Sequence, residues 1–173
     1  MNCSCTPIGP RRRQFFAIAG GAALWGLRRG LARAASGEYE AMVLACIDPR
    51  LQEPVHDYLK KRGLIGRFSQ FTIAGAADGV VAPRFAAWHD TFWDNLAISA
   101  ELHQIKRVIA IDHRDCGAAK LAYGAASIAT PNAETETHRK AFGQFRRELA
   151  RRQPKLAVET GLMALDGSIL MLS

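Results

Sequence analysis

Two short apolar runs constrain the fold of this chain more than any other feature. Residues 41–47 (AMVLACI) and 107–112 (RVIAID) are apolar almost throughout. Neither run shows the alternation of a half-exposed strand or the spacing of a surface helix. Such runs are typical of strands buried on both faces, as in parallel sheets covered by helices. We therefore expect an α/β fold with a mostly parallel central sheet flanked by helices.

The rest of the chain predicts the elements around these two strands. Apolar residues recur at helical spacing in four segments, at residues 53–62, 90–104, 116–123 and 134–152. A further strand is expected at residues 68–74. Near the end, residues 158–172 surround an Asp-Gly turn and predict either two strands or one strand and its exit.

The N-terminal segment has the three parts of an export signal. Arginines at positions 11–13 precede an apolar run at residues 15–27, and the small-residue sequence Ala-Arg-Ala follows at residues 32–34. The apolar run is 13 residues long, whereas a bilayer span needs about 20. We therefore expect no permanent membrane span.

The pair Arg12-Arg13, followed closely by two phenylalanines, resembles a twin-arginine signal, which exports folded proteins. We expect a twin-arginine-type signal peptide over residues 1–34 and a zinc domain over residues 35–173. The domain would be exported, to a periplasmic or other extracytoplasmic location. An uncleaved anchor and a basic helix on a membrane surface are the alternatives.

The charge of the chain is concentrated in that segment. The formal net charge is +7, but six of the 23 lysine and arginine residues lie in the first 34 positions, where none of the 16 acidic residues lies. Residues 35–173 therefore carry 17 basic residues against 16 acidic ones. This balance argues against a nucleic-acid partner, which would require a basic surface.

Two motifs that carry chemistry follow the two apolar strands. The first is C-x-D-x-R, formed by Cys46, Asp48 and Arg50, and the second is H-x-x-C-G, with His113 and Cys116. Ligands of open α/β sheets bind at the carboxyl ends of the strands. Residues two apart in extended chain point the same way, so Cys46, Asp48 and Arg50 are expected to face one site.

Thiolate and imidazole are preferred ligands of zinc, so Cys46, His113 and Cys116 predict one Zn²⁺ site. Three protein ligands leave a fourth position open, as in catalytic zinc sites, and zinc lowers the pKa of bound water to about 7. Asp48, oriented by Arg50, would then hold the zinc-bound hydroxide or occupy the fourth position itself. The alternatives are a Cys46–Cys116 disulfide, two inert core thiols, and a merely structural Asp48–Arg50 ion pair.

With these motifs the chain resembles the β-class carbonic anhydrases, from about residue 41 to residue 172. The resemblance implies zinc ligation by Cys46, His113 and Cys116 and a catalytic dyad of Asp48 and Arg50. It implies a zinc lyase that hydrates CO₂ reversibly to bicarbonate, in a homodimer or a higher even oligomer. Hydrolysis of carbonyl sulfide or carbon disulfide, and a non-catalytic metal-binding member of the family, are the alternative functions.

Three departures from the family pattern concern substrate and assembly. Pro49 stands where the family usually has Ser, and Ile73 stands where it commonly has Asn. The domain is a short form, without most of the N-terminal helical arm. Asp115 is expected to cap the helix that follows it, or else to orient a neighbour of the site. The remaining histidines are expected to be surface or core residues rather than ligands: His56, His89, His103 and His138.

Overall fold

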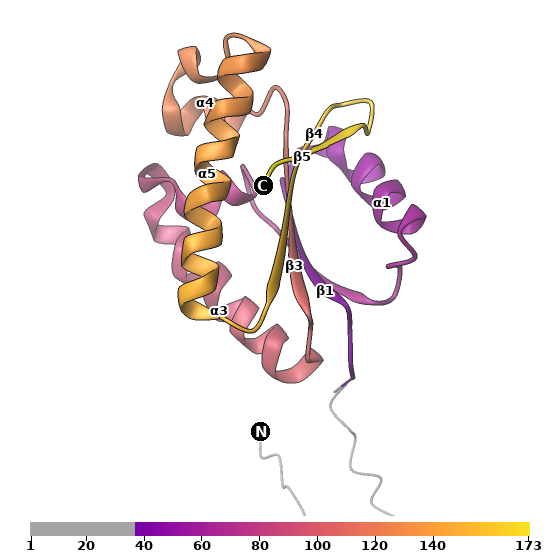
Figure 1. Ribbon diagram of the computed structural model, residues 1–173. Coiled ribbons are helices and arrows are strands. Elements are labelled where there is room, and N and C mark those ends of the chain that lie inside the picture. The colour runs from indigo at the N-terminus through magenta and orange to yellow at the C-terminus, as the bar shows by residue number, and fades with distance from the viewer. Residues whose placement is uncertain (1–36) are drawn as a thin grey trace, which may run out of the picture. The chain divides into compact units, whose positions relative to one another are not determined.

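The computed structural model describes residues 37–173, which form a parallel-centred α/β fold (Figure 1). Five strands make one sheet in the order β2-β1-β3-β4-β5. Their bounds are β1 (Ala41–Ala45), β2 (Phe68–Thr72), β3 (Arg107–His113), β4 (Ala157–Met163) and β5 (Ile169–Met171). Every neighbouring pair is parallel except β4 and β5, which are antiparallel. The predicted mostly parallel sheet is confirmed.

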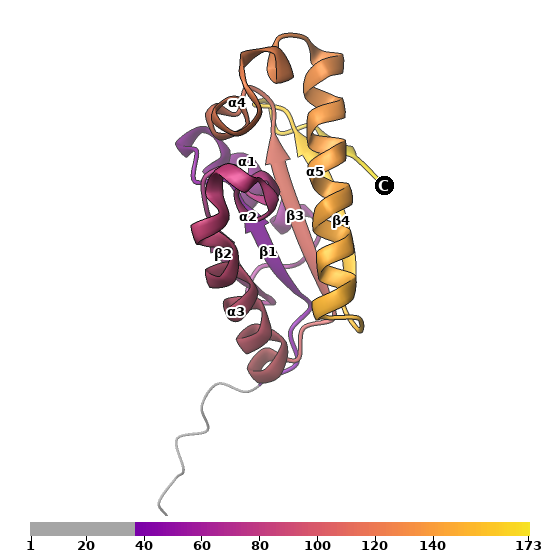
Figure 2. The same cartoon turned by 90° about the vertical axis from the view of Figure 1, so that its left-hand side faces the viewer.

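Helices cover both faces of this sheet. They are α1 (Gln52–Lys61), α2 (Ala77–Val81), α3 (Ala86–His103), α4 (Gly117–Tyr123) and α5 (Pro131–Arg152). Figure 1 shows α1 on one side of the sheet, with α3, α4 and α5 on the other, and Figure 2 looks onto the side of α2, α3 and α5. Side chains of β1 alternate between the two faces: Val43 packs in the cluster with α1, and Leu44 packs in the cluster with α3 and α5.

Most expected elements are present, but two helices begin earlier than expected and one was missed; α5 begins at Pro131 rather than at residue 134, because Thr130 caps it and Pro131 is its first residue. The two-strand interpretation of residues 158–172 is confirmed, because Gly161 pairs with Met171 across β4 and β5. Helix α3 begins at Ala86 rather than at residue 90, since the 3-10 turn Pro83–Phe85 leads directly into it. The short helix α2 was not predicted at all. Its five residues are too few to show helical spacing in the sequence.

The expected signal peptide over residues 1–34, with its arginine pair, lies outside the described residues. Within residues 37–173, no helix combines the length and the apolar character that crossing a bilayer requires.

An ion-pair network ties β4 to β3 and to the chain after α1. Glu159 Oε2 lies 2.6 Å from Arg62 Nη1, and Glu159 Oε1 lies 3.0 Å from Arg107 Nη1. The hydrogen bonds from Arg62 lower the pKa of Glu159 below its ordinary value of 4.5. Burial opposes this shift, and the charge of Arg107 supports it. The ionised form of Glu159 therefore stabilises the fold.

We expect Glu159→Gln to lower the free energy of unfolding by about 1 kcal/mol at pH 7. Because the folded pKa is lowered, this contribution is complete above pH 4.5 and is lost as the pH falls through the folded pKa. Urea denaturation of both proteins between pH 7 and pH 3 should therefore show a shrinking difference. Glu101→Gln, at an exposed position of α3, serves as the control. A difference that stays constant over this range would contradict the assignment.

Candidate metal centre

Cys46, His113 and Cys116 converge at the carboxyl edge of the sheet. Cys46 directly follows β1, His113 ends β3, and Cys116 directly precedes α4. The ends of β1 and β3 lie side by side because Ala45 pairs with Ile111 in parallel register. One sulfur or nitrogen atom from each of the three residues lies within 4.8 Å of the others, and all three residues are buried. The structure thus brings together the three residues that the sequence named.

The His113 ring presents a free nitrogen to this cluster. Its Nδ1 lies 2.8 Å from the carbonyl oxygen of Arg114. A carbonyl only accepts hydrogen bonds, so this contact places a proton on Nδ1, and the neutral imidazole then carries its lone pair on Nε2. Nε2 is buried and has no hydrogen-bond partner among residues 37–173. An unpartnered basic nitrogen beside two thiols is what a metal ligand requires.

The two cysteines are free thiols in the structure, and their acidities differ. The hydrogen bond from the Cys116 thiol, against the opposing effect of burial, is the main cause that lowers the pKa of Cys46 to about 4. The same contact, together with burial, raises the pKa of Cys116. The site therefore stabilises a thiolate at Cys46 at neutral pH. Thiolate is the form of cysteine that binds metals.

A third segment reaches the site after β2. The Gly75 N–H donates a hydrogen bond of 3.2 Å to Cys46 Sγ. Gly75 has a φ of +82°, a backbone conformation that side chains with a Cβ rarely adopt. Ile73, two residues earlier, donates its N–H to the carbonyl of Ala45 and packs against the core. Backbone groups thus position this segment, and the side chain of Ile73 adds an apolar surface.

Asp48 and Arg50 form a tightly bonded pair beside His113. Arg50 donates from its backbone N and its Nε to Asp48 Oδ1, at 2.9 and 3.0 Å, and from Nη2 to Oδ2 at 2.7 Å. These hydrogen bonds are the main cause that lowers the pKa of Asp48 to about 2. Asp48 Oδ2 also lies 3.9 Å from His113 Nε2. Asp48 is therefore an ionised carboxylate that borders His113, one of the three candidate ligands.

Pro49 fits this arrangement without loss of a hydrogen bond. It begins the 3-10 turn Pro49–Leu51, and Asp48 is the residue before that turn. The backbone N–H that Asp48 accepts comes from Arg50, so a proline at position 49 removes none of the hydrogen bonds to Asp48. Asp48 has an extended backbone, with φ −55° and ψ 123°, as a residue before proline prefers.

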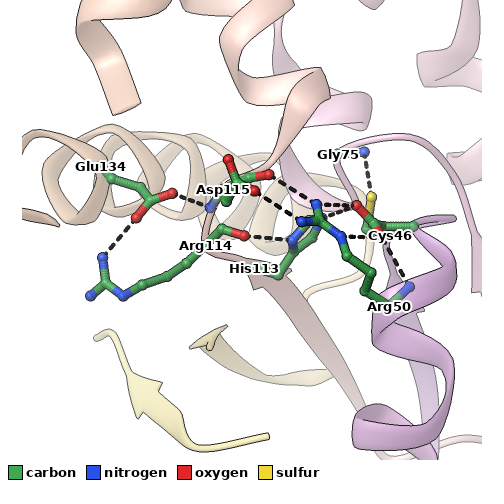
Figure 3. A network of polar contacts seen from close by, with 8 residues as sticks. Cys46, Arg50, Gly75, His113, Arg114, Asp115 and Glu134 are labelled. Atoms are coloured by element: carbon green, nitrogen blue, oxygen red, sulfur yellow. Dashed lines mark hydrogen bonds and ion pairs between the residues drawn. The ribbon is translucent and has the colours of Figure 1, made fainter. Parts of the chain in front are cut away.

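The expected capping role of Asp115 is wrong. The helix that follows is preceded by Cys116 and has no side-chain cap. Instead, Asp115 Oδ2 accepts a hydrogen bond of 2.9 Å from Arg50 Nη1, and the Asp115 carbonyl accepts one from Nη2. Arg50 therefore joins the two motifs, as Figure 3 shows. This is the alternative expected from the sequence, in which Asp115 orients a neighbour of the site.

Glu134, in the first turn of α5, was not predicted as part of the site. It is 6% exposed. One of its oxygens accepts a hydrogen bond from the Asp115 backbone N–H, and the other accepts one of 2.9 Å from Arg114 Nη1. Glu134 thereby holds the loop between His113 and Cys116. No sequence motif marks it, because its partners are about twenty positions away.

Comparison with known proteins identifies the family. A family described as "Putative carbonic anhydrase" matches residues 36–146. The chain belongs to this carbonic-anhydrase-like family. A relative from Rickettsia bellii, described as an uncharacterized protein, is 33% identical over 132 residues, which are 76% of this chain and 80% of the relative.

Solved carbonic anhydrases share the fold of this family member. A carbonic anhydrase from Streptococcus mutans superposes with a TM-score of 0.53 at 16% identity, over 80% of this chain and 84% of that one. For tetrameric β-carbonic anhydrases from Sordaria macrospora the TM-score is 0.51 at 14% identity, over 82% and 84% of the two chains. The fold expected from the resemblance is confirmed.

We expect Glu134→Ala to lower the free energy of unfolding by about 1–3 kcal/mol, because it leaves the Asp115 N–H and Arg114 without their buried partner. Urea denaturation measures the change. Glu136→Ala, two residues along the same helix, removes only an exposed pair with Arg139 and should cost less than about 0.5 kcal/mol. Equal losses in the two variants would show that Glu134 does not hold the loop.

Proposed function

We propose that this protein is a zinc-dependent lyase that hydrates CO₂ reversibly to bicarbonate. One observation carries the proposal: the unpartnered Nε2 of His113 and two free thiols converge directly beside an ionised Asp48. Membership of the carbonic-anhydrase-like family supports it. Asp48 and Arg50 are the proposed catalytic residues.

The chemistry of the donor set fits zinc. Cys46, His113 and Cys116 offer two sulfurs and one nitrogen, the combination that zinc prefers over magnesium or calcium. Three protein ligands leave a fourth tetrahedral position open, as in catalytic zinc sites. When bound, zinc lowers the pKa of water toward neutrality and so supplies the nucleophile for CO₂.

The residues of the chain orient this reaction. Asp48 Oδ2 is proposed to accept a hydrogen bond from the reacting water, which fixes the direction of the oxygen lone pair toward CO₂. The guanidinium of Arg50 keeps Asp48 ionised, so the carboxylate accepts that hydrogen bond at neutral pH rather than donating one. Both oxygens of Asp48 bond to Arg50. We therefore propose that Asp48 orients water rather than occupying the fourth ligand position.

Hydrolysis of a sulfur analogue of CO₂ is the second candidate. Ile73 is apolar at a position where the family commonly has Asn, and its half-buried side chain supplies an apolar surface in place of a polar contact. Such a surface suits CO₂, carbonyl sulfide and carbon disulfide alike. Sulfide release from carbonyl sulfide, measured alongside CO₂ hydration, separates the two substrates.

We further propose that the protein works as a homodimer or a higher even oligomer. The solved Sordaria macrospora relatives are described as tetrameric. Strand β2 is an edge of the sheet, and an edge strand offers backbone groups for pairing with another chain.

We propose export to the periplasm or another extracytoplasmic compartment through a signal over residues 1–34. A site built from two free thiolates is best filled with zinc before it meets an oxidising environment, since bound metal protects the thiolates from disulfide formation. The twin-arginine route exports proteins in the folded state and so permits zinc to be inserted before export.

The direct test is CO₂ hydration by the zinc-loaded protein, followed with a pH indicator in a stopped-flow instrument. We expect a rate well above that of the buffer. Cys116→Ser should remove one zinc per chain and reduce the rate to that of the buffer, because two ligands hold zinc poorly. The proposed activity would be refuted if wild-type protein that holds the Cys116-dependent zinc hydrated CO₂ no faster than the buffer does. Without sulfide release either, that result would favour a non-catalytic metal-binding protein.

Asp48→Asn tests the dyad separately from the metal. We expect CO₂ hydration to fall by about 10²-fold or more, since the amide no longer serves as an anionic acceptor, while the zinc content stays unchanged. Asp57→Asn, at an exposed position of α1, is the matched control and should keep the wild-type rate. Full activity in Asp48→Asn would exclude Asp48 from catalysis.

A further inference from the structure

A second group of possible ligands lies buried behind the candidate zinc site. It consists of Asp78 from α2, Asp112 from β3 and His138 from α5, here called the core trio. Their exposed fractions are 0%, 1% and 0%. One ligand atom from each lies within 4.8 Å of the others. The sequence predicted His138 to be a core or surface residue, and the structure places it in the core.

The hydrogen bonds of the core trio leave one carboxylate without a donor. Asp112 Oδ1 accepts from the Ala77 N–H at 2.8 Å, and Asp112 Oδ2 lies 3.0 Å from His138 Nδ1. The same Nδ1 lies 3.1 Å from Asp78 Oδ2. A ring nitrogen carries at most one hydrogen, and neither oxygen of Asp78 has a hydrogen-bond partner within residues 37–173.

The charge of the core trio must be balanced by a cation or by protons. Two carboxylates face a single imidazole, so without a cation the trio is neutral only when His138 is charged and one acid is protonated, and burial and the charge of Asp78 raise the pKa of Asp112 to about 7. A buried carboxylate without partners costs several kcal/mol. The phenol of Tyr123 and the thiol of Cys116 are further titratable groups beside the two acids. Burial, the charges of Asp78 and Asp112 and the contact with Asp78 raise the pKa of Tyr123, and the contact with the other thiol, burial and the charge of Asp112 are among the causes that raise the pKa of Cys116, so neither group supplies a positive charge.

A divalent cation satisfies both requirements at once. It neutralises two carboxylates and takes a lone pair from the imidazole. In octahedral coordination, bonds of about 2.1 Å from a metal to N and O ligands place neighbouring ligand atoms about 3 Å apart, which is the spacing of Nδ1 from the two Oδ2 atoms. Carboxylate and imidazole together suit zinc, manganese or ferrous iron.

We propose that the core trio binds a divalent transition-metal ion through Asp78 Oδ2, Asp112 Oδ2 and His138 Nδ1. This second site is separate from Cys46, His113 and Cys116 and does not depend on the proposed hydration of CO₂. The ion joins α2 and α5 to the end of β3, one residue before His113. Its role is to fix the strand end that carries that ligand.

Cobalt titration distinguishes the two sites, because only thiolate ligands give an intense charge-transfer band with Co²⁺. The experiment uses the full chain, made metal-free, with Cys3 and Cys5 replaced by Ser so that the band reports Cys46 and Cys116. We expect two Co²⁺ per chain, one of which produces the band. Asp78→Asn and His138→Gln should each lose one Co²⁺ and keep the band. The controls Asp94→Asn and His56→Gln, at exposed positions, should bind two.

A variant with an intact core trio makes the test independent of how the trio variants fold. The double variant Cys46→Ser, Cys116→Ser should still bind one Co²⁺, without the band, and its thermal midpoint should rise when Co²⁺ is added. The proposal would be overturned if this double variant bound no Co²⁺, or if the protein with both sites intact bound only one Co²⁺ per chain. CO₂ hydration is measured in a separate assay, so a negative result there does not change the number of Co²⁺ ions bound per chain.

Discussion

The parallel pairing of β1 with β3 is the interaction on which the candidate metal centre depends. Because Ala45 lies opposite Ile111, the next residues of both strands emerge at one edge of the sheet. A register shift by one residue would turn Cys46 toward the opposite face and separate it from His113. The apolar side chains of both strands are buried between helices on two sides, which makes such a shift costly. The packing of the core therefore fixes the positions of ligands far apart in the sequence.

Hydrogen bonds to charged groups, rather than apolar packing, then order the loops beyond the strand ends. The side chain of Arg50 is 45% exposed, and a single ion pair at such a position contributes little to stability. Arg50 contributes mainly by positioning other groups, since its planar guanidinium bonds to Asp48 on one side and to Asp115 on the other. Glu134 fixes the same loop from α5. Three elements thus determine how the carboxylate of Asp48 faces His113.

The sequence predicted the strands and the convergence of Cys46, His113 and Cys116 because both leave local signals. An unbroken apolar run followed by a polar motif marks β1 and β3, and metal-binding residue types mark the three candidate ligands. It did not predict what depends on distant partners. Asp115 meets Arg50 across 65 positions, so its local position favoured a capping role that the fold does not use. Helix α2 was missed because it is short, and no local pattern indicated that Asp78 within it would be buried.

The two candidate sites share the end of β3, where Asp112 and His113 are adjacent. Successive side chains of a strand point to opposite faces, so one residue meets α2 and α5 while the next meets the thiols. Replacing buried charged groups with apolar residues of similar size is often neutral or stabilising, so core packing alone does not require two acids and a histidine there. Such a group can instead fix the orientation of the strand end, because its bonds are directional, whereas apolar contacts are not. Any movement of Asp112 would carry His113 with it, and the geometry of the first site therefore depends on what the core trio holds.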